Sequence, residues 1–200
     1  MINMRDGMRV LKETEPDAIV LVAETATVAW ADIVGPDDKY LPVSSMSKAS
    51  SVALGIAIAQ PERKVVVWDG DGCLLMNLGT LITVARAAPP NLIHIILENG
   101  VYALTGAQPL PSQYVSDLPE MARSAGYRHI HTYSDTEAFK TDLPAILAAD
   151  GPTLISLETE TEVIPVVGWS KRPNPPKNWK TIVPVIKRDI TEKSDAVGLD

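Results

Sequence analysis

The sequence predicts an α/β protein, with a doubly wound parallel sheet of five or six strands and helices on both faces. Short apolar runs rich in β-branched residues alternate with longer helical segments along the chain. This alternation is typical of parallel strands joined by crossover helices. The apolar runs are nearly continuous, as expected for strands that are buried on both faces.

Each predicted strand is an apolar run that stops at turn-forming residues. These runs span residues 18–23, 64–68, 91–97, 128–132 and 153–157. Their length and continuity indicate buried strands. The stretch 27–42 contains the turn signal Gly35-Pro36, and we expect it to be irregular.

The predicted helices occupy the intervals around these strands. They span residues 1–16, 46–59, 74–88, 118–125 and 134–149. Ser44 and Ser45 are candidate N-caps for the second helix. Ser134 is the expected cap of the fifth, where Glu137 completes a capping box. Proline or glycine ends the third and fourth helices.

Composition limits the class of protein. The 200 residues, 46% of them hydrophobic, suit one domain with a sizeable core. A net charge of −7 without a basic cluster argues against a nucleic-acid partner. The single cysteine, Cys73, excludes an internal disulfide framework. We find no signal peptide and no apolar run of about 20 residues, so we expect a cytoplasmic protein without a membrane span.

The chain divides into two regions by composition. Residues 1–167 form the predicted α/β domain, and residues 168–200 form a C-terminal arm and polar tail. The arm contains three prolines and two tryptophans in W-S-K-R-P-N-P-P-K-N-W, and we expect it to be extended and to pack on something else. Residues 187–200 are polar, and we expect them to be frayed or disordered.

Two strand ends carry the chemistry. Gly70-Asp71-Gly72 follows the strand at 64–68, and Glu98-Asn99-Gly100 follows the strand at 91–97. In a parallel sheet both ends lie at the same edge, where open α/β sheets bind ligands. Oxygen ligands beside backbone N–H groups suit Mg²⁺ bound together with a phosphate.

These residues also carry a family resemblance. G-D-G followed by an asparagine in N-G resembles the thiamine diphosphate-binding signature of the decarboxylase and acetolactate synthase superfamily. The segment S-S-M-S-K-A-S-S-V-A-L-G-I-A resembles a helix start in sulfopyruvate and phosphonopyruvate decarboxylases, with Ser44 and Ser47 in place of two glycines. T-G-A-Q-P at 105–109 resembles a segment of the same group, and the resemblance covers residues 18–160 in order and spacing.

The resemblance implies thiamine diphosphate and Mg²⁺ as cofactors and a role for each motif position. The implied metal ligands are the side chains of Asp71 and Asn99 and the Val101 carbonyl. The implied cofactor-binding residues are Ser44, Met46, Gly70, Asp71, Gly72, Cys73, Asn99 and Val101. Among them, Met46 is expected to bend the cofactor, and the Ser44 carbonyl is expected to accept a hydrogen bond from its amino group.

The implied function is decarboxylation of a 2-oxo acid resembling sulfopyruvate or phosphonopyruvate, by the diphosphate-binding subunit of a two-subunit enzyme. No catalytic residue is assigned in this chain. The activating glutamate is expected on a separate pyrimidine-binding subunit, in a hetero-oligomer such as α2β2 or larger. Two alternatives stay open: carboligation of the acetolactate synthase type, and a non-catalytic α/β assembly module, for which Ser44 and Ser47 are the support.

The remaining polar candidates have simpler interpretations. His94 is expected to be a hydrogen-bonded core residue. His129 and His131 alternate on a strand without a third metal ligand nearby. Glu98 is either a supporting group of the site or a strand-end carboxylate, and the sequence does not choose between them.

Overall fold

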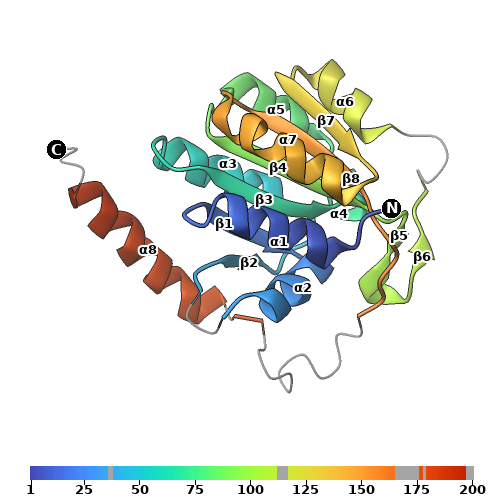
Figure 1. Ribbon diagram of the computed structural model, residues 1–200, viewed down its shortest axis with the longest axis horizontal. Coiled ribbons are helices and arrows are strands. Elements are labelled where there is room, and N and C mark those ends of the chain that lie inside the picture. Colours follow the sequence, from blue (N-terminus) through green and yellow to red (C-terminus); the bar gives the residue numbers. More distant parts are fainter. Residues whose placement is uncertain (36–37, 112–116, 165–175, 178, 197–200) are drawn as a thin grey trace.

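A six-stranded parallel sheet forms the centre of the molecule, in the computed structural model that describes residues 1–35, 38–111, 117–164, 176–177 and 179–196 (Figure 1). The strand order is β2-β1-β3-β4-β8-β7. The strands are β1 (Ile19–Ala23), β2 (Leu41–Val43), β3 (Val65–Gly70), β4 (Leu92–Glu98), β7 (His129–Tyr133) and β8 (Thr153–Glu158). Every pairing in this sheet is parallel, which confirms the predicted fold class.

Helices cover both faces of the sheet. The helices are α1 (Met4–Thr14), α2 (Thr25–Ile33), α3 (Ala49–Ala59), α4 (Asp71–Leu75), α5 (Gly79–Ala87), α6 (Leu118–Ala125), α7 (Thr136–Ala148) and α8 (Trp179–Ala196). Side chains of α1, α2 and α7 pack in one hydrophobic core, and those of α3, α5, α6 and α8 pack in a second. A two-stranded antiparallel hairpin, β5 (Val101–Tyr102) and β6 (Gln108–Pro109), follows β4 around a short 3₁₀ turn, Ala103–Thr105.

The central strands are buried on both faces because each side chain meets one of the two cores. On β3, Val66 and Trp68 belong to the first core, whereas Val65 and Val67 belong to the second. Full burial of such a side chain stabilises the fold by roughly 1.5–3 kcal/mol. This explains why the strands read as continuous apolar runs in the sequence.

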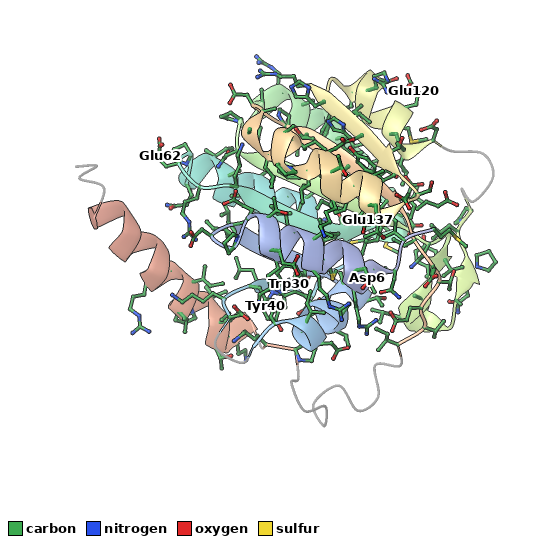
Figure 2. The ribbon with its side chains drawn as sticks, in the orientation of Figure 1. Asp6, Trp30, Tyr40, Glu62, Glu120 and Glu137 are labelled. Atoms are coloured by element: carbon green, nitrogen blue, oxygen red, sulfur yellow. The ribbon has the colours of Figure 1, made fainter. Side chains whose placement is uncertain are left out.

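Aromatic side chains anchor the first core, while charged side chains lie outside it. Trp30 of α2 packs against Trp68, with ring centroids 6.4 Å apart. Of the residues labelled in Figure 2, the carboxylates Asp6, Glu62, Glu120 and Glu137 are exposed, whereas Trp30 and Tyr40 are buried.

The stretch 27–42, predicted to be irregular, was the main error in the secondary structure. It contains most of α2 and the first two residues of β2. Seven of the nine residues of α2 are buried, so the helix has no polar face and no 3.6-residue pattern to reveal it. Its first residue follows Glu24, whose side chain makes no capping hydrogen bond.

Three predicted helix starts and ends also need correction. Ser44 and Ser45 do not cap a helix, because residues 45–47 form a bend and turn and α3 begins at Ala49. Asp135, rather than Ser134, caps α7 and accepts a hydrogen bond from the Ala138 N–H. The single helix predicted at 74–88 is two helices, α4 and α5, with a turn between them.

The C-terminal region is partly described. Residues 187–196, expected to be frayed or disordered, belong to α8, whose Ile182 and Ile186 bury in the second core beside β2 (Figure 1). Most of the expected extended arm, which starts at residue 168, lies outside the described residues. Over the described part of the chain, no helix has both the length and the apolar character that crossing a membrane requires.

Candidate active site

The ends of β3 and β4 form the centre of the candidate site. The two strands are neighbours, and Gly70 is paired with Leu97. Asp71 connects the ends directly: one carboxylate oxygen accepts a hydrogen bond from the Gly72 N–H at 2.7 Å, and the other accepts from the Gly100 N–H at 2.7 Å. Asp71 and the Asn99 loop, separated in the sequence, therefore lie together at the carboxyl edge of the sheet.

A cavity opens at this edge. The predicted residues on its wall are Met46, Gly70, Asp71, Gly72, Cys73, Asn99 and Val101. Ser44 is the exception, since it is exposed and is not among the lining residues. The structure thus brings together every predicted cofactor-binding residue except Ser44.

Gly72 is a point where the backbone approaches other groups too closely for a side chain. A Cβ atom at this position would lie 2.6 Å and 2.8 Å from two ring carbons of Tyr102 and 2.9 Å from Leu110 Cδ2. Real Cβ atoms do not occupy such positions without a shift of the neighbours. The second glycine of the G-D-G motif is therefore required by packing against the β5–β6 hairpin.

The charged side chains on the wall of the cavity are all acidic. Asp71, Glu24, Glu160 and Glu162 line it, and no lysine or arginine is present among its described lining residues. Burial raises the pKa of Asp71 to about 6, despite the opposing hydrogen bonds from Gly100 and Gly72. Burial also raises the pKa of Glu24, with a smaller contribution from the charge of Asp69. The site therefore holds the carboxylates of Asp71 and Glu24 in a place where they are poorly solvated.

Several lining residues were missed in the sequence. Glu24 and Thr25 follow β1, and Tyr102 belongs to the hairpin after β4. Glu24 has a backbone φ of 50°, which is rare for a residue with a side chain. Glu162 is paired with Arg5 of α1. Glu24-Thr25 also resembles a loop that follows the first strand in the same decarboxylases, although no site role was predicted for it. The other residues share only a position just after a strand or within a loop, which is too general to identify a site.

A buried polar chain lies beneath the strand ends. The His94 Nδ1 lies 3.0 Å from the Tyr127 hydroxyl, and the His94 Nε2 lies 3.4 Å from Asp69 Oδ2. All three side chains are at most 5% exposed. The other oxygen of Asp69 accepts a hydrogen bond from the Gly70 N–H at 2.9 Å. His94 is thus the hydrogen-bonded core residue that was predicted.

The other polar candidates do not contribute to the cavity. Glu98 hydrogen-bonds to Ser156 and lines a separate cleft, so it is not on the wall of the candidate site. His129 and His131 belong to no metal-binding group of histidine, cysteine and acidic residues within the described part of the chain. Cys73 is buried, and that burial raises the pKa of its thiol, which disfavours the thiolate.

Comparison with known protein families identifies the domain. Residues 34–157 match the family described as thiamine pyrophosphate enzyme, C-terminal TPP binding domain. The chain belongs to this family. The match contains the candidate metal ligands Asp71, Asn99 and Val101, and it confirms the resemblance that the motifs indicated.

Two similar proteins are decarboxylases. The chain is 42% identical over 166 residues to phosphonopyruvate decarboxylase from Streptomyces hygroscopicus, which covers 82% of this chain and 40% of that protein. It is 43% identical over 113 residues to sulfopyruvate decarboxylase subunit beta from Methanothermobacter thermautotrophicus, which covers 56% of this chain and 57% of that subunit. The chain therefore spans about two fifths to three fifths of these relatives.

A solved structure supports the fold. The thiamine diphosphate-dependent 4-hydroxybenzoylformate decarboxylase of Rhodococcus jostii RHA1 superposes with a TM-score of 0.68 at 24% identity. The match covers 82% of this chain and 33% of that protein. At this identity the comparison establishes a shared fold.

Proposed function

We propose that this chain is the diphosphate-binding part of a thiamine diphosphate- and Mg²⁺-dependent decarboxylase of 2-oxo acids. The observation that carries the proposal is the meeting of Asp71, Asn99 and Gly72 at one cavity in a domain of the thiamine pyrophosphate enzyme family. The names of the similar decarboxylases support sulfopyruvate- or phosphonopyruvate-like substrates.

The donor set fits a hard divalent cation. Asp71 provides a carboxylate, Asn99 a carboxamide oxygen and Val101 a backbone carbonyl, which are ligands that Mg²⁺ accepts. Each Asp71 oxygen already accepts one backbone hydrogen bond, and each keeps a further lone pair. These residues would hold the metal ion.

The charge of the cavity supports the need for a metal ion. A diphosphate entering a cavity lined by Glu24, Asp71 and Glu160 is repelled, and no described lining residue is a lysine or arginine that would offset this. A divalent cation reverses the local field. We therefore assign charge neutralisation of the diphosphate to Mg²⁺ rather than to basic side chains.

The residues of this chain bind and orient, while the cofactor supplies the reactive chemistry. Bound thiamine diphosphate provides the carbon nucleophile and the electron sink for loss of CO₂ from a 2-oxo acid. Met46 lies 36% exposed on the cavity wall, where it would support the middle of the cofactor. The activating glutamate comes from a separate pyrimidine-binding subunit in a hetero-oligomer, a proposal supported by the subunit beta name of a similar protein.

Reconstitution tests this function. The chain is purified alone and together with a candidate pyrimidine-binding subunit, and CO₂ release from sulfopyruvate, phosphonopyruvate and pyruvate is measured with thiamine diphosphate and Mg²⁺. We expect decarboxylation only from the complex, and loss of activity in Asp71→Ala. Activity of the chain alone would refute the two-subunit proposal, and a condensed product from pyruvate would indicate carboligation instead.

A further inference from the structure

Met46 sits in a turn that its own sequence does not favour. The Lys48 N–H donates to the Ser45 carbonyl at 3.2 Å and closes the turn around Met46 and Ser47. Ser47 has a φ of 69°, at the turn position where glycine is preferred because it has no Cβ atom. Something outside the turn must therefore hold Ser47 in this conformation.

Two side chains from the segment after β3 provide that hold. The Ser47 N–H donates to Cys73 Sγ at 3.0 Å, and the Asn77 Nδ2 donates to the Ser47 carbonyl at 3.0 Å. The first bond fixes the peptide between Met46 and Ser47, and the second fixes the peptide after Ser47. The two peptide groups that flank Ser47 are thus both hydrogen-bonded to the same short segment.

That segment also carries the expected metal ligand. Asp71 is the first residue of α4, Cys73 lies in the same helix, and Asn77 lies in the turn between α4 and α5. Asn77 is itself held there, because its N–H donates to the Leu74 carbonyl at 2.9 Å and its carbonyl accepts from the Thr80 N–H at 3.0 Å. One compact unit therefore connects Asp71 with the Met46 turn.

We propose that Cys73 and Asn77 are positioning residues that fix Met46 at a set place relative to Asp71. The proposal rests on the proposed function, because Met46 matters only if a cofactor lies between it and the metal-binding edge. It gives Cys73 a role as hydrogen-bond acceptor, where the sequence suggested only a small side chain. A buried thiol suits that role, because accepting a hydrogen bond requires no reaction with solvent or substrate.

Thiol labelling of the full chain tests, without any cofactor, whether Cys73 and Asn77 hold the Met46 turn in place. Cys73 is the single cysteine, 3% exposed, and a disulfide reagent reaches it when the Met46 turn opens. We expect Asn77→Ala to speed labelling at least about tenfold, since the turn opens locally once the bond to Ser47 is lost. Met76→Ala, one residue away and 52% exposed, should leave the rate unchanged.

A second asparagine controls for a general loss of stability. Asn91 donates its Nδ2 to the carbonyls of Ala57, Gln60 and Arg63 at the opposite end of the sheet. Asn91→Ala should speed labelling only as far as its lower free energy of unfolding predicts. The proposal is overturned if Asn77→Ala is labelled no faster than its own loss of unfolding free energy predicts. If Asn91→Ala does not fold, the labelling rate of Met76→Ala is the baseline.

Kinetics of the reconstituted complex test the positioning role. We expect Asn77→Ala to lower kcat by about 10–100-fold with little change in substrate KM, because misplacement of a supporting group costs rate. In a Met46→Ala background the same substitution should have almost no effect, because the residue it positions is absent. An equal loss of kcat in both backgrounds would refute action through Met46, whereas an inactive wild-type complex would refute the proposed function and leave the labelling result standing.

Discussion

Replacement of Gly72 by alanine tests whether the G-D-G motif is required by packing as well as by ligand binding. The new Cβ would lie 2.6 Å and 2.8 Å from Tyr102 ring carbons and 2.9 Å from Leu110 Cδ2. Because atoms of two side chains are too close, rotation of the half-buried Tyr102 ring alone does not relieve the contact. Overpacking of this kind costs about 1–3 kcal/mol.

A helix-propensity term acts in the opposite direction and needs a matched control. Alanine is favoured over glycine inside a helix by roughly 0.5–1 kcal/mol, and Gly72 lies within α4. Gly55 lies within α3, where an added Cβ meets nothing within 4 Å. The difference between Gly72→Ala and Gly55→Ala therefore isolates the contact with Tyr102 and Leu110.

Urea and thermal unfolding of the two variants, followed by circular dichroism, measure this difference. We expect Gly72→Ala to be less stable than Gly55→Ala by about 1–3 kcal/mol, or roughly 2–12 °C in Tm for a domain of this size. In the double variant with Tyr102→Ala, the part of the penalty due to the Tyr102 ring should disappear, and the part due to the contact with Leu110 Cδ2 should remain. Equal stability of Gly72→Ala and Gly55→Ala would refute the close approach.

Three further outcomes follow from the buried polar groups. Mg²⁺-dependent cofactor binding should weaken as the pH falls below about 6, by about tenfold per pH unit, because Asp71 must lose its proton to ligate the ion; pH-independent binding would contradict this assignment. The stability of the chain without ligand should change in the opposite direction with pH. The folded state holds the Asp71 proton more tightly than the unfolded state, so the contribution of Asp71 to the free energy of unfolding rises as the pH falls through about 6. In urea titrations, the free energy of unfolding of an Asp71→Ala variant should therefore depend less on pH. Tyr127→Phe should lower the free energy of unfolding by about 1–3 kcal/mol, because His94 loses its buried partner, and an unchanged urea midpoint would count against that bond.

All strands of the large sheet except β2, and the sheet edge that carries the G-D-G and N-G motifs, were predictable because their physical causes are local. A strand buried on both faces must be apolar throughout, so β3 and β4 are visible as runs. The Gly70–Gly72 and Asn99 turns follow directly, and the parallel sheet brings them together. The packing need at Gly72 is not visible in the same way, because Tyr102 and Leu110 reach it through a hairpin whose position depends on the whole fold.

The errors arose where tertiary contacts decide the local structure. Helix α2 is buried nearly all round, so its sequence lacks the polar face that marks a surface helix. Ser47 has a positive φ, which is unfavourable for a serine. Helix α3 therefore starts after this residue and not at the predicted serine caps. The acidic side chains of the wall, Glu24, Asp71, Glu160 and Glu162, come from segments far apart in the sequence, so their common position is evident only in three dimensions.

Calorimetric titration of thiamine diphosphate into the reconstituted complex tests the central claim most directly. The account predicts saturable binding in the presence of Mg²⁺, no measurable binding in EDTA, and at least roughly tenfold weaker binding for Asp71→Ala with Mg²⁺ present. Equally tight binding in EDTA, or an unchanged affinity of Asp71→Ala, would contradict a metal-anchored diphosphate at the ends of β3 and β4.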